Sequence, residues 1–368
     1  MDALVIGGTG PTGPFIVRGL LERGYKVTVL NRGSRDTPEI PDTVERIKGD
    51  PHFKETLADA LAGRRFDVIV ATYGRIRYVA EVVAAHTDRL VTVGGSPAIK
   101  GSRQPEQVFP AGARTPLPDD APRIETPEEF HFGYLARISE DAVMDRHAAG
   151  DYVGTHLRYP IIYGPRQLRP AEWWVMRRIL DGRDYIVLPD SGLTMITRGY
   201  SENMAHAVLC AVDHPEASAG QIYNCGDVHQ LTLAQWVEVI ASTMGAKLDV
   251  HAVPGPLAFS ARDLMISRRT SHHQLFDMHK IRAELGYADK VSVLDALAST
   301  VRSYQDSPPE ETEEMKANLA LHYQTEDEMV KIVERACAEL AAVTHIDPEY
   351  RHPYAHPKKP GEKDHHGR

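Results

Sequence analysis

The feature that most constrains the fold of this chain is a glycine-rich turn close to its first residue. A short apolar strand is predicted over residues 3–6, and a helix is predicted over residues 12–23. Between them, glycines permit a tight turn and let backbone N–H groups approach a pyrophosphate at the positive end of the helix. Because strand, loop and helix come in the order that a dinucleotide site needs, we predict cofactor contacts from Gly7, Thr9, Gly10, Pro11, Thr12 and Gly13. The alternative is a glycine-rich turn without a ligand.

The following residues repeat the alternation of strand and helix. Continuous apolar strands separated by helices are typical of a parallel sheet that is covered on both faces. We therefore predict an α/β fold, a Rossmann-like doubly wound parallel sheet. Its further strands are predicted over residues 26–30, 67–71, 89–93 and 155–159.

The C-terminal region differs from the rest in charge. After Asp306 there are 13 acidic and 8 basic residues, a net charge of −5 in a chain of 368 residues whose formal charge is −9. Helix-start signals occur at residues 307–310 and again at 325–328. We therefore predict two appended helices over residues 305–345, with their acidic residues in solvent, and a tail rich in proline and histidine over residues 346–368. The second helix has an apolar face of Met329, Ile332, Val333, Ala336, Leu340 and Val343.

Composition limits the class of protein. With 42% hydrophobic and 25% charged residues the chain is ordinary globular protein, and no stretch approaches the roughly 20 apolar residues that span a bilayer. Three cysteines form no disulfide framework, so we expect a cytoplasmic protein with no membrane partner. The negative charge argues against nucleic acid as a partner. The histidine pairs 272–273 and 352/356 lack cysteine or acidic ligands, so no metal site is predicted.

The end of the second strand bears on the choice of dinucleotide. An acidic residue there selects NAD, whereas an arginine accommodates the 2′-phosphate of NADP. The chain has Asn31 and Arg32 at this point, with Arg35 close behind, so we favour NADP and keep NAD as the alternative. Asp50 and Tyr73 follow later strands and are predicted to border the same cofactor. If the prediction of a 2′-phosphate contact is wrong, Arg32 simply stays solvated.

Four later stretches resemble the extended short-chain dehydrogenase/reductase superfamily, in its NAD-dependent epimerase/dehydratase family. The stretches are residues 157–166 (Leu-Arg-Tyr-Pro-Ile-Ile-Tyr-Gly-Pro-Arg), 198–205, 220–227 and 276–287. With the glycine loop, the resemblance runs from residue 3 to about residue 304. It implies an NAD(P)-binding Rossmann domain over residues 1–165, in which Pro160 contacts the cofactor. It also implies a smaller C-terminal substrate-binding part over residues 166–304, some of whose strands return to the sheet.

The resemblance also implies a catalytic set. That family uses a serine or threonine after the fifth strand and a Tyr-x-x-x-Lys pair on the next helix. Ser96 stands at the first position, but the chain is atypical because no lysine lies between residues 100 and 247. We predict that Tyr134 is the proton donor or acceptor and that Arg137 replaces the lysine. The alternative is that Tyr134 packs and Arg137 pairs with Asp141, at i and i+4.

Substrate contacts are predicted from two further positions. In similar sugar-nucleotide enzymes the residue at the position of Arg198 binds substrate phosphate. Trp173 and Trp174 point about 100° apart on a helix, so we expect one in the core. The other, taken as Trp174, is predicted to line the substrate pocket or an interface. Arg177 and Arg178 either meet an anionic substrate or stay solvated.

These observations predict an NAD(P)-dependent oxidoreductase that transfers hydride between nicotinamide and a carbonyl or carbinol substrate held near Ser96. One alternative is a sugar-nucleotide epimerase or dehydratase that recycles its NAD internally. Another is a non-redox protein that binds a dinucleotide or RNA on the same fold, as the similar chloroplast stem-loop-binding proteins do with RNA. We expect a small-molecule substrate and, as the commonest state of soluble oligomers, a homodimer.

Overall fold

The computed structural model describes residues 1–33, 37–168, 170–265, 271–346, 350, 352–354, 359–364 and 367. Its centre is a seven-stranded sheet made of β1 (Asp2–Ile6), β2 (Lys26–Asn31), β3 (Glu45–Lys48), β4 (Val68–Ala71), β5 (Arg89–Gly95), β6 (Val153–Tyr159) and β10 (Gln221–Asn224). The strand order is β10-β6-β5-β4-β1-β2-β3, and every neighbouring pair is parallel. The predicted doubly wound α/β fold is confirmed.

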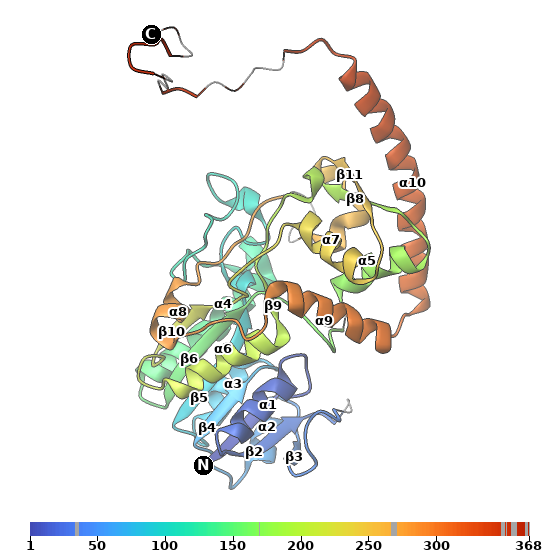
Figure 1. The fold of residues 1–368 in the computed structure, drawn as a ribbon. Coiled ribbons are helices and arrows are strands. Elements are labelled where there is room, and N and C mark those ends of the chain that lie inside the picture. The colour runs from blue at the N-terminus through green and yellow to red at the C-terminus, as the bar shows by residue number, and fades with distance from the viewer. Residues whose placement is uncertain are drawn as a thin grey trace.

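Helices cover both faces of this sheet, because alternate strand residues are apolar on both sides (Figure 1). In β1, Ala3 and Val5 belong to one core, and Leu4 and Ile6 belong to the other. The first core includes α1 (Gly13–Glu22), α6 (Ser201–Asp213) and α8 (His279–Leu285). The second includes α2 (Lys54–Leu61), α3 (Ile76–Val83) and α4 (Pro127–Ala148).

The strand order reverses direction between β1 and β4. In open α/β sheets, ligands bind in the crevice beyond the carboxyl ends of the strands at such a switch point. The glycine loop leaves β1 at this end of the sheet, so the fold places it where a ligand is expected.

A third hydrophobic core, separate from the two on the faces of the sheet, lies beside the sheet (Figure 1). Trp236 and Val237 are buried in it, on a helix whose N-cap Thr232 accepts from the Gln235 backbone in a capping box. Its helices are α5 (Ala171–Leu180), α7 (Leu233–Thr243) and α9 (Val293–Asp306), and its parallel strand pairs are β8 (Tyr185–Pro189) with β11 (Asp249–Val253) and β7 (Ile161–Tyr163) with β9 (Arg198–Tyr200).

The segment between β5 and α4 is irregular, apart from 3-10 turns at Ser96–Ala98 and Pro105–Gln107. It is tied to the body by backbone bonds on both sides of Leu117, which donates to Leu275 O at 2.6 Å and accepts from Asp277 N at 2.8 Å. This irregular segment is therefore hydrogen-bonded to the rest of the fold at Leu117.

The prediction of a helix beginning at Thr325 is wrong. A single helix, α10 (Glu313–Ala341), runs through this position, and Thr312 caps it by accepting from Met315 N at 3.2 Å. The Thr325 hydroxyl donates to Leu321 O at 2.9 Å, one turn back in the same helix. A serine or threonine that bonds back in this way sits inside a helix, so its cap-like sequence does not start a new one.

The sequence predicts that the acidic residues of this region lie in solvent, but the structure buries one of them. Glu326 is fully buried and forms an ion pair with Arg178 of α5, at 2.6 Å. Leu319 and Val330 of α10 are buried on the body too, whereas Ile332, Leu340 and Val343 of the predicted apolar face are exposed. Leu340 and Val343 are exposed because the end of α10 extends past the body (Figure 1). Among the described residues, none of the helices combines the length and apolar character needed to cross a membrane.

Candidate functional site

The glycine loop between β1 and α1 requires glycine at particular positions. Gly7 has a φ of +110°, and a Cβ on it would lie 2.6 Å from Thr72 Oγ1. A Cβ on Gly13 would lie 2.0 Å from the carbonyl oxygen of Gly8, so the helix could not start this close to the loop. Gly10 differs from both, because nothing lies within 4 Å of its Cβ position. The loop is therefore closed on its inner side and open to a ligand at Gly10.

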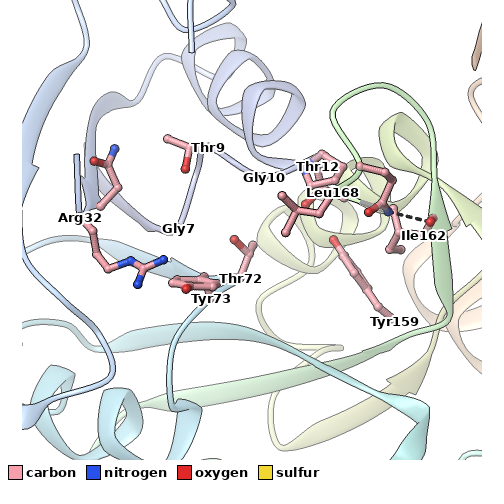
Figure 2. A pocket seen from close by; sticks show the side chains of 13 residues that line it. Gly7, Thr9, Gly10, Thr12, Arg32, Thr72, Tyr73, Tyr159, Ile162 and Leu168 are labelled. Carbon is pink, nitrogen blue, oxygen red and sulfur yellow. Dashed lines mark hydrogen bonds between the residues drawn. The ribbon is translucent and has the colours of Figure 1, made fainter. Parts of the chain in front are cut away.

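A cavity of about 370 Å³ lies over this loop (Figure 2). Such a volume is in the range of small-molecule sites. In Figure 2, Arg32 and Tyr73 lie at one end of the cavity, and Tyr159, Ile162 and Leu168 lie at the other. The lining residues are Gly7, Thr9, Gly10, Pro11, Thr12, Asn31, Arg32, Thr72, Tyr73, Tyr159, Ile162, Gln167 and Leu168.

The residues present fit the diphosphate of a dinucleotide. The positive end of α1, its N-terminus, adjoins the loop, and its first turn carries no acidic residue. Among the described residues that line the cavity, Arg32 is the one charged side chain. An anion therefore meets a helix N-terminus, open space at Gly10 and a cation, and no carboxylate belongs to this described lining.

Most of the predicted cofactor contacts line this cavity, but three do not. Gly13 lies beneath the loop, where it permits the close packing described above. Asp50 lines a neighbouring cavity of about 580 Å³, together with Arg32 and Lys48. Pro160 is not among the lining residues, although Tyr159 beside it is. Their contacts with a cofactor stay predictions.

The side chains at the β2 end of the cavity are held in place by their neighbours. The Arg32 guanidinium lies over the Tyr73 ring, with 5.5 Å between its carbon and the ring centroid. Asn31 Oδ1 accepts from Gly33 N at 2.8 Å, so this oxygen is used within the turn. Arg35, the other predicted phosphate contact, lies outside the described residues.

Asp50 stays a carboxylate beside this end of the site. Its Oδ1 accepts from the backbone N–H of His52 at 3.0 Å and lies 2.8 Å from His52 Nδ1. The backbone hydrogen bond is the main reason that the pKa of Asp50 lies below its ordinary value. The negative charge of Asp50 therefore lies beside Arg32 in the neighbouring cavity.

The far wall of the cavity was missed by sequence reasoning. Tyr159 is buried and donates its hydroxyl to Met204 O at 2.9 Å, and burial raises its pKa well above the ordinary value. Gln167 Nε2 donates to Ile162 O at 2.6 Å, which holds the loop that carries Leu168 (Figure 2). The stretch 157–166 that carried the family resemblance was the available signal, but only Pro160 was chosen from it.

The predicted catalytic residues lie where β5 meets α4. Ser96 is buried in the 3-10 turn after β5. The helix packs tightly on this turn, because a Cβ on Gly133 would lie 2.4 Å from Pro97 O. Ser96 and Tyr134 thus belong to touching segments, although neither is among the residues that line the cavity.

Arg137 has partners of its own. Its Nη1 donates to Asp141 Oδ2 at 2.6 Å and its Nη2 donates to Glu125 O at 3.2 Å. The guanidinium also lies over the Tyr134 ring, at 5.2 Å from the centroid. The ion pair that we had set against a catalytic role is therefore present, and a role for Arg137 at the nicotinamide ribose stays a prediction.

A buried ion pair fixes α4 against the sheet. Arg158 of β6 donates from Nε and Nη2 to the two carboxylate oxygens of Glu140, at 2.7 and 2.8 Å, and both side chains are 1% exposed. Arg158 Nη1 also donates to Asp119 O. Since Glu140 lies two turns after Gly133 on α4, this pair sets how the start of the helix meets the Ser96 turn.

The two predicted substrate contacts have different surroundings. Trp174 stacks on His322 of α10 with 6.3 Å between ring centroids, and its predicted place in a substrate pocket or an interface stays a prediction. Arg198 is buried, lies over Trp236 at 4.8 Å and borders a small cavity together with His272. The structure thus draws Trp174 to the added helix and leaves Arg198 beside a cavity.

The arginines after these tryptophans are used within the protein. Arg178 pairs with the buried Glu326, and Arg177 pairs with Asp181 at 2.5 Å. Both arginines are therefore paired with carboxylates of the protein rather than with a substrate or with solvent alone. Glu326 of α10 is the partner of Arg178, and Glu311, which precedes α10, is a second partner of Arg177.

A buried carboxyl lies close to Arg198. Glu172 of α5 is 2% exposed, and burial raises its pKa to about 7. Burial also lowers the pKa of Arg198 to about 10. Each group shifts toward its neutral form, since both have lost water and gain only a long-range attraction. Within the described part of the chain, no three His, Cys, Asp or Glu side chains gather as a metal site would need.

Comparisons with known proteins agree with this geometry. A family model described as the NAD dependent epimerase/dehydratase family matches residues 3–226. The chain is 27% identical over 261 residues to the 3-diazoavenalumate denitrifying reductase of a Streptomyces species, which spans 67% of this chain and 82% of that protein. It is 23% identical over 316 residues to chloroplast stem-loop binding protein of 41 kDa b of Arabidopsis thaliana, which spans 81% of this chain and 77% of that one.

A solved structure shows the same fold. UDP-glucose 4-epimerase from Thermotoga maritima has a TM-score of 0.66 at 18% identity, over 83% of this chain and 99% of that one. The family match, unlike this one, rests on sequence, and it spans more than half of the chain from the first strand to the turn after β10. The chain therefore belongs to the NAD-dependent epimerase/dehydratase family.

Proposed function

We propose that this protein is an NADP-preferring oxidoreductase with a small carbonyl or carbinol substrate. The observation that carries the proposal is the cavity over the glycine loop, in which Arg32 is the one charged side chain among the described lining residues. The relative from Streptomyces is called a reductase, which supports a redox role over a purely structural use of the fold. When bound, a nicotinamide dinucleotide supplies or accepts the hydride.

The residues that would hold this cofactor have separate tasks. The loop backbone from Thr9 to Gly13 surrounds the pyrophosphate. The N–H groups of Gly10 and Thr12 are its donors, because those of Thr9 and Gly13 donate to Gly7 O and Gly10 O and Pro11 has none. Arg32 donates charge-assisted hydrogen bonds to the 2′-phosphate. The buried Tyr159 and the exposed Leu168 bound the other end of the cavity and limit how far the cofactor extends.

The substrate would lie between residues 1–165 and the part made by residues 166–304. In this proposal the Ser96 hydroxyl polarises the substrate oxygen, Tyr134 holds or supplies a proton there, and Arg198 binds an anionic group of the substrate. A cytoplasmic homodimer without a nucleic-acid or membrane partner belongs to the proposal as well. Light scattering after size-exclusion chromatography tests the dimer.

The choice of dinucleotide is tested by replacing Arg32. In Arg32→Gln the dissociation constant for NADPH should rise about 10- to 100-fold, because a charge-assisted phosphate contact is lost, while that for NADH changes less than about 3-fold. Isothermal titration calorimetry measures both. The matched control is Arg75→Gln, since Arg75 also lies over aromatic rings, those of Phe53 and Tyr78, but does not line the cavity. Equal weakening of NADPH and NADH in Arg32→Gln would contradict the assignment.

The proton role is tested by removing one oxygen atom. Tyr134→Phe should lower kcat by about 10²- to 10⁴-fold in a screen of carbonyl substrates with NADPH, as expected for a general acid or base. Tyr78→Phe is the control, because Tyr78 of α3 is a half-buried tyrosine like Tyr134. Full activity of Tyr134→Phe would exclude this residue as the proton donor. Turnover without any added coenzyme would instead favour the epimerase or dehydratase alternative.

A further inference from the structure

One ion pair joins the two segments that flank the dinucleotide cavity. Arg166 Nη1 lies 2.8 Å from both carboxylate oxygens of Glu39, which is 127 residues earlier in the chain. We propose that this pair is a clasp over the cavity, which must open before a dinucleotide can leave and so sets its release rate. The inference rests on the proposed binding of a dinucleotide in this cavity.

Each partner adjoins residues that line the cavity. Arg166 comes directly before Gln167 and Leu168, which belong to the far wall. Glu39 lies on the connection that follows β2, whose last residue Asn31 and its neighbour Arg32 line the other end. The ion pair therefore joins the segment between β2 and β3 to the loop after β7, and these two segments flank the cavity.

Both segments are anchored away from the ion pair. On the Glu39 side, Ile40 is 2% exposed, and Arg46 Nη2 donates to Thr37 O and Ile40 O at 3.3 and 3.1 Å. On the other side, Tyr304 donates its hydroxyl to Gly164 O at 2.7 Å. Since both segments are fixed at these hydrogen bonds, the clasp opens by the movement of side chains and of the short stretch that carries Arg166.

The backbone at Arg166 is poised for such a movement. Its φ is +70°, a conformation that costs free energy for a residue with a Cβ. The next residue but one, Leu168, is 71% exposed although it lines the cavity, so little packing holds the stretch down. The contacts of Arg166 with Glu39, and with Thr37 Oγ1 at 3.5 Å, join this stretch to the β2–β3 connection.

The clasp makes a prediction that a phosphate contact by Arg166 would not. If Arg166 bound the cofactor directly, Glu39 would compete for it, so removing Glu39 should slow release and removing Arg166 should speed it. In the clasp, removal of either partner speeds release. The two side chains are 24% and 40% exposed, so the interaction is of the modest strength of surface ion pairs.

The test measures the dissociation rate of NADPH from the full-length protein by stopped-flow fluorescence, with excess NADP as the chase. Glu39→Gln and Arg166→Gln should each release NADPH about two- to five-fold faster than wild type, and the difference should shrink as salt is raised. The charge-swapped double variant, Glu39→Arg with Arg166→Glu, should return the rate to near the wild-type value. Thermal unfolding confirms that each variant is folded.

Arg23 and Asp213 supply a matched control. They form another long-range ion pair with similar exposure, 27% and 39%, at the far end of α1. Arg23→Gln should leave the NADPH release rate unchanged. Unchanged release in both clasp variants, or slower release in Glu39→Gln, would overturn the clasp while leaving the binding site in place. Failure of the wild type to bind any dinucleotide would instead overturn the proposed function, and the clasp with it.

Discussion

Two buried arginine–carboxylate pairs hold helices at opposite ends of this molecule. Arg158 and Glu140 join β6 to α4 in the dinucleotide half, and Arg178 and Glu326 join α5 to α10 in the C-terminal half. All four side chains are at most 2% exposed. The first pair connects residues 18 positions apart within the family fold, whereas the second connects residues 148 positions apart, one of them in the added helix.

The difference between the pairs is in what surrounds them. Glu140 also lies 3.2 Å from Arg123 and 4.0 Å from His156, a buried histidine whose pKa is lowered to about 4 mainly by burial. Glu326 has Arg183 at 3.6 Å as its second cation. Since burying charges costs nearly as much as their attraction returns, such pairs fix which surfaces meet more than they add stability. The Arg158–Glu140 pair therefore orients α4 in the dinucleotide half, and the Arg178–Glu326 pair attaches the added helix.

The largest effect is expected from breaking the pair in the dinucleotide half. Glu140→Gln should lower the free energy of unfolding by about 3–5 kcal/mol, because Arg158 stays buried without a counter-charge. It should also lower kcat, since Glu140 sets where the start of α4 meets the Ser96 turn. Urea unfolding and steady-state kinetics measure the two effects, with exposed Glu128→Gln on the same helix as the control. An unchanged kcat in folded Glu140→Gln would separate this pair from the site.

The pair at the other end should affect stability alone. Glu326→Gln should lower the free energy of unfolding by about 3 kcal/mol and detach α10, because Arg178 loses its counter-charge. NADPH affinity should not change, since the pair lies in the core beside the sheet. Urea unfolding, limited proteolysis within α10 and calorimetric titration check the three statements. Glu328→Gln, an exposed change two residues on, is the control.

A third buried carboxyl sharpens the comparison, because no described cation lies within ion-pair distance of it. The pKa of Glu172 is raised from its ordinary 4.5 to about 7, so the folded protein binds this proton more tightly than the unfolded chain does. The contribution of Glu172 to stability therefore falls as pH rises from about 4.5 to about 7. Glu172→Gln, which mimics the neutral acid, should be more stable than wild type by about 3 kcal/mol at pH 8 and equal to it at pH 4.

Urea unfolding of both proteins across this pH range measures the difference, and exposed Glu238→Gln on α7 is the control. If the free energy of unfolding changed with pH in the same way in wild type and in Glu172→Gln, ionisation of Glu172 would not destabilise the folded protein. The effects of Asp227, whose pKa burial raises to about 6, cancel in this comparison because both proteins keep it.

The smallest effect is expected at the start of the added helix. Thr312 caps α10, so Thr312→Ala should lower the free energy of unfolding by about 1 kcal/mol. Thr325→Ala should cost less or even stabilise, because Thr325 is an internal helix residue whose hydroxyl only bonds back to Leu321. Thermal unfolding followed by circular dichroism compares the two. An equal loss in both variants would revive the idea that a second helix begins near Thr325.

Much of the fold and half of the site could be predicted because they depend on residues close together in sequence. The glycine loop and the strands are local patterns, in which neighbouring residues satisfy one another's backbone groups. The helix starts predicted at residues 307–310 and 325–328 are both wrong, because the cap of α10 is Thr312. The wall formed by Tyr159 and Leu168 could not be found in this way, because it lines the cavity only after β6 has joined the sheet beside β5. The role of Arg137 was left open for the same reason, since its partners Asp141 and Glu125 compete with any cofactor.

The sequence by itself determined the α/β class, the position of the dinucleotide loop and the family. Glycine conformations and strand–helix periodicity act over a few residues, so they can be read along the chain. Only the tertiary structure decided which charges are buried together: Arg178 with Glu326, Arg158 with Glu140, and Arg166 with Glu39. A lone arginine or glutamate has the same sequence signal in solvent and in a core, and its partner is chosen by the packing of elements that are distant in the chain.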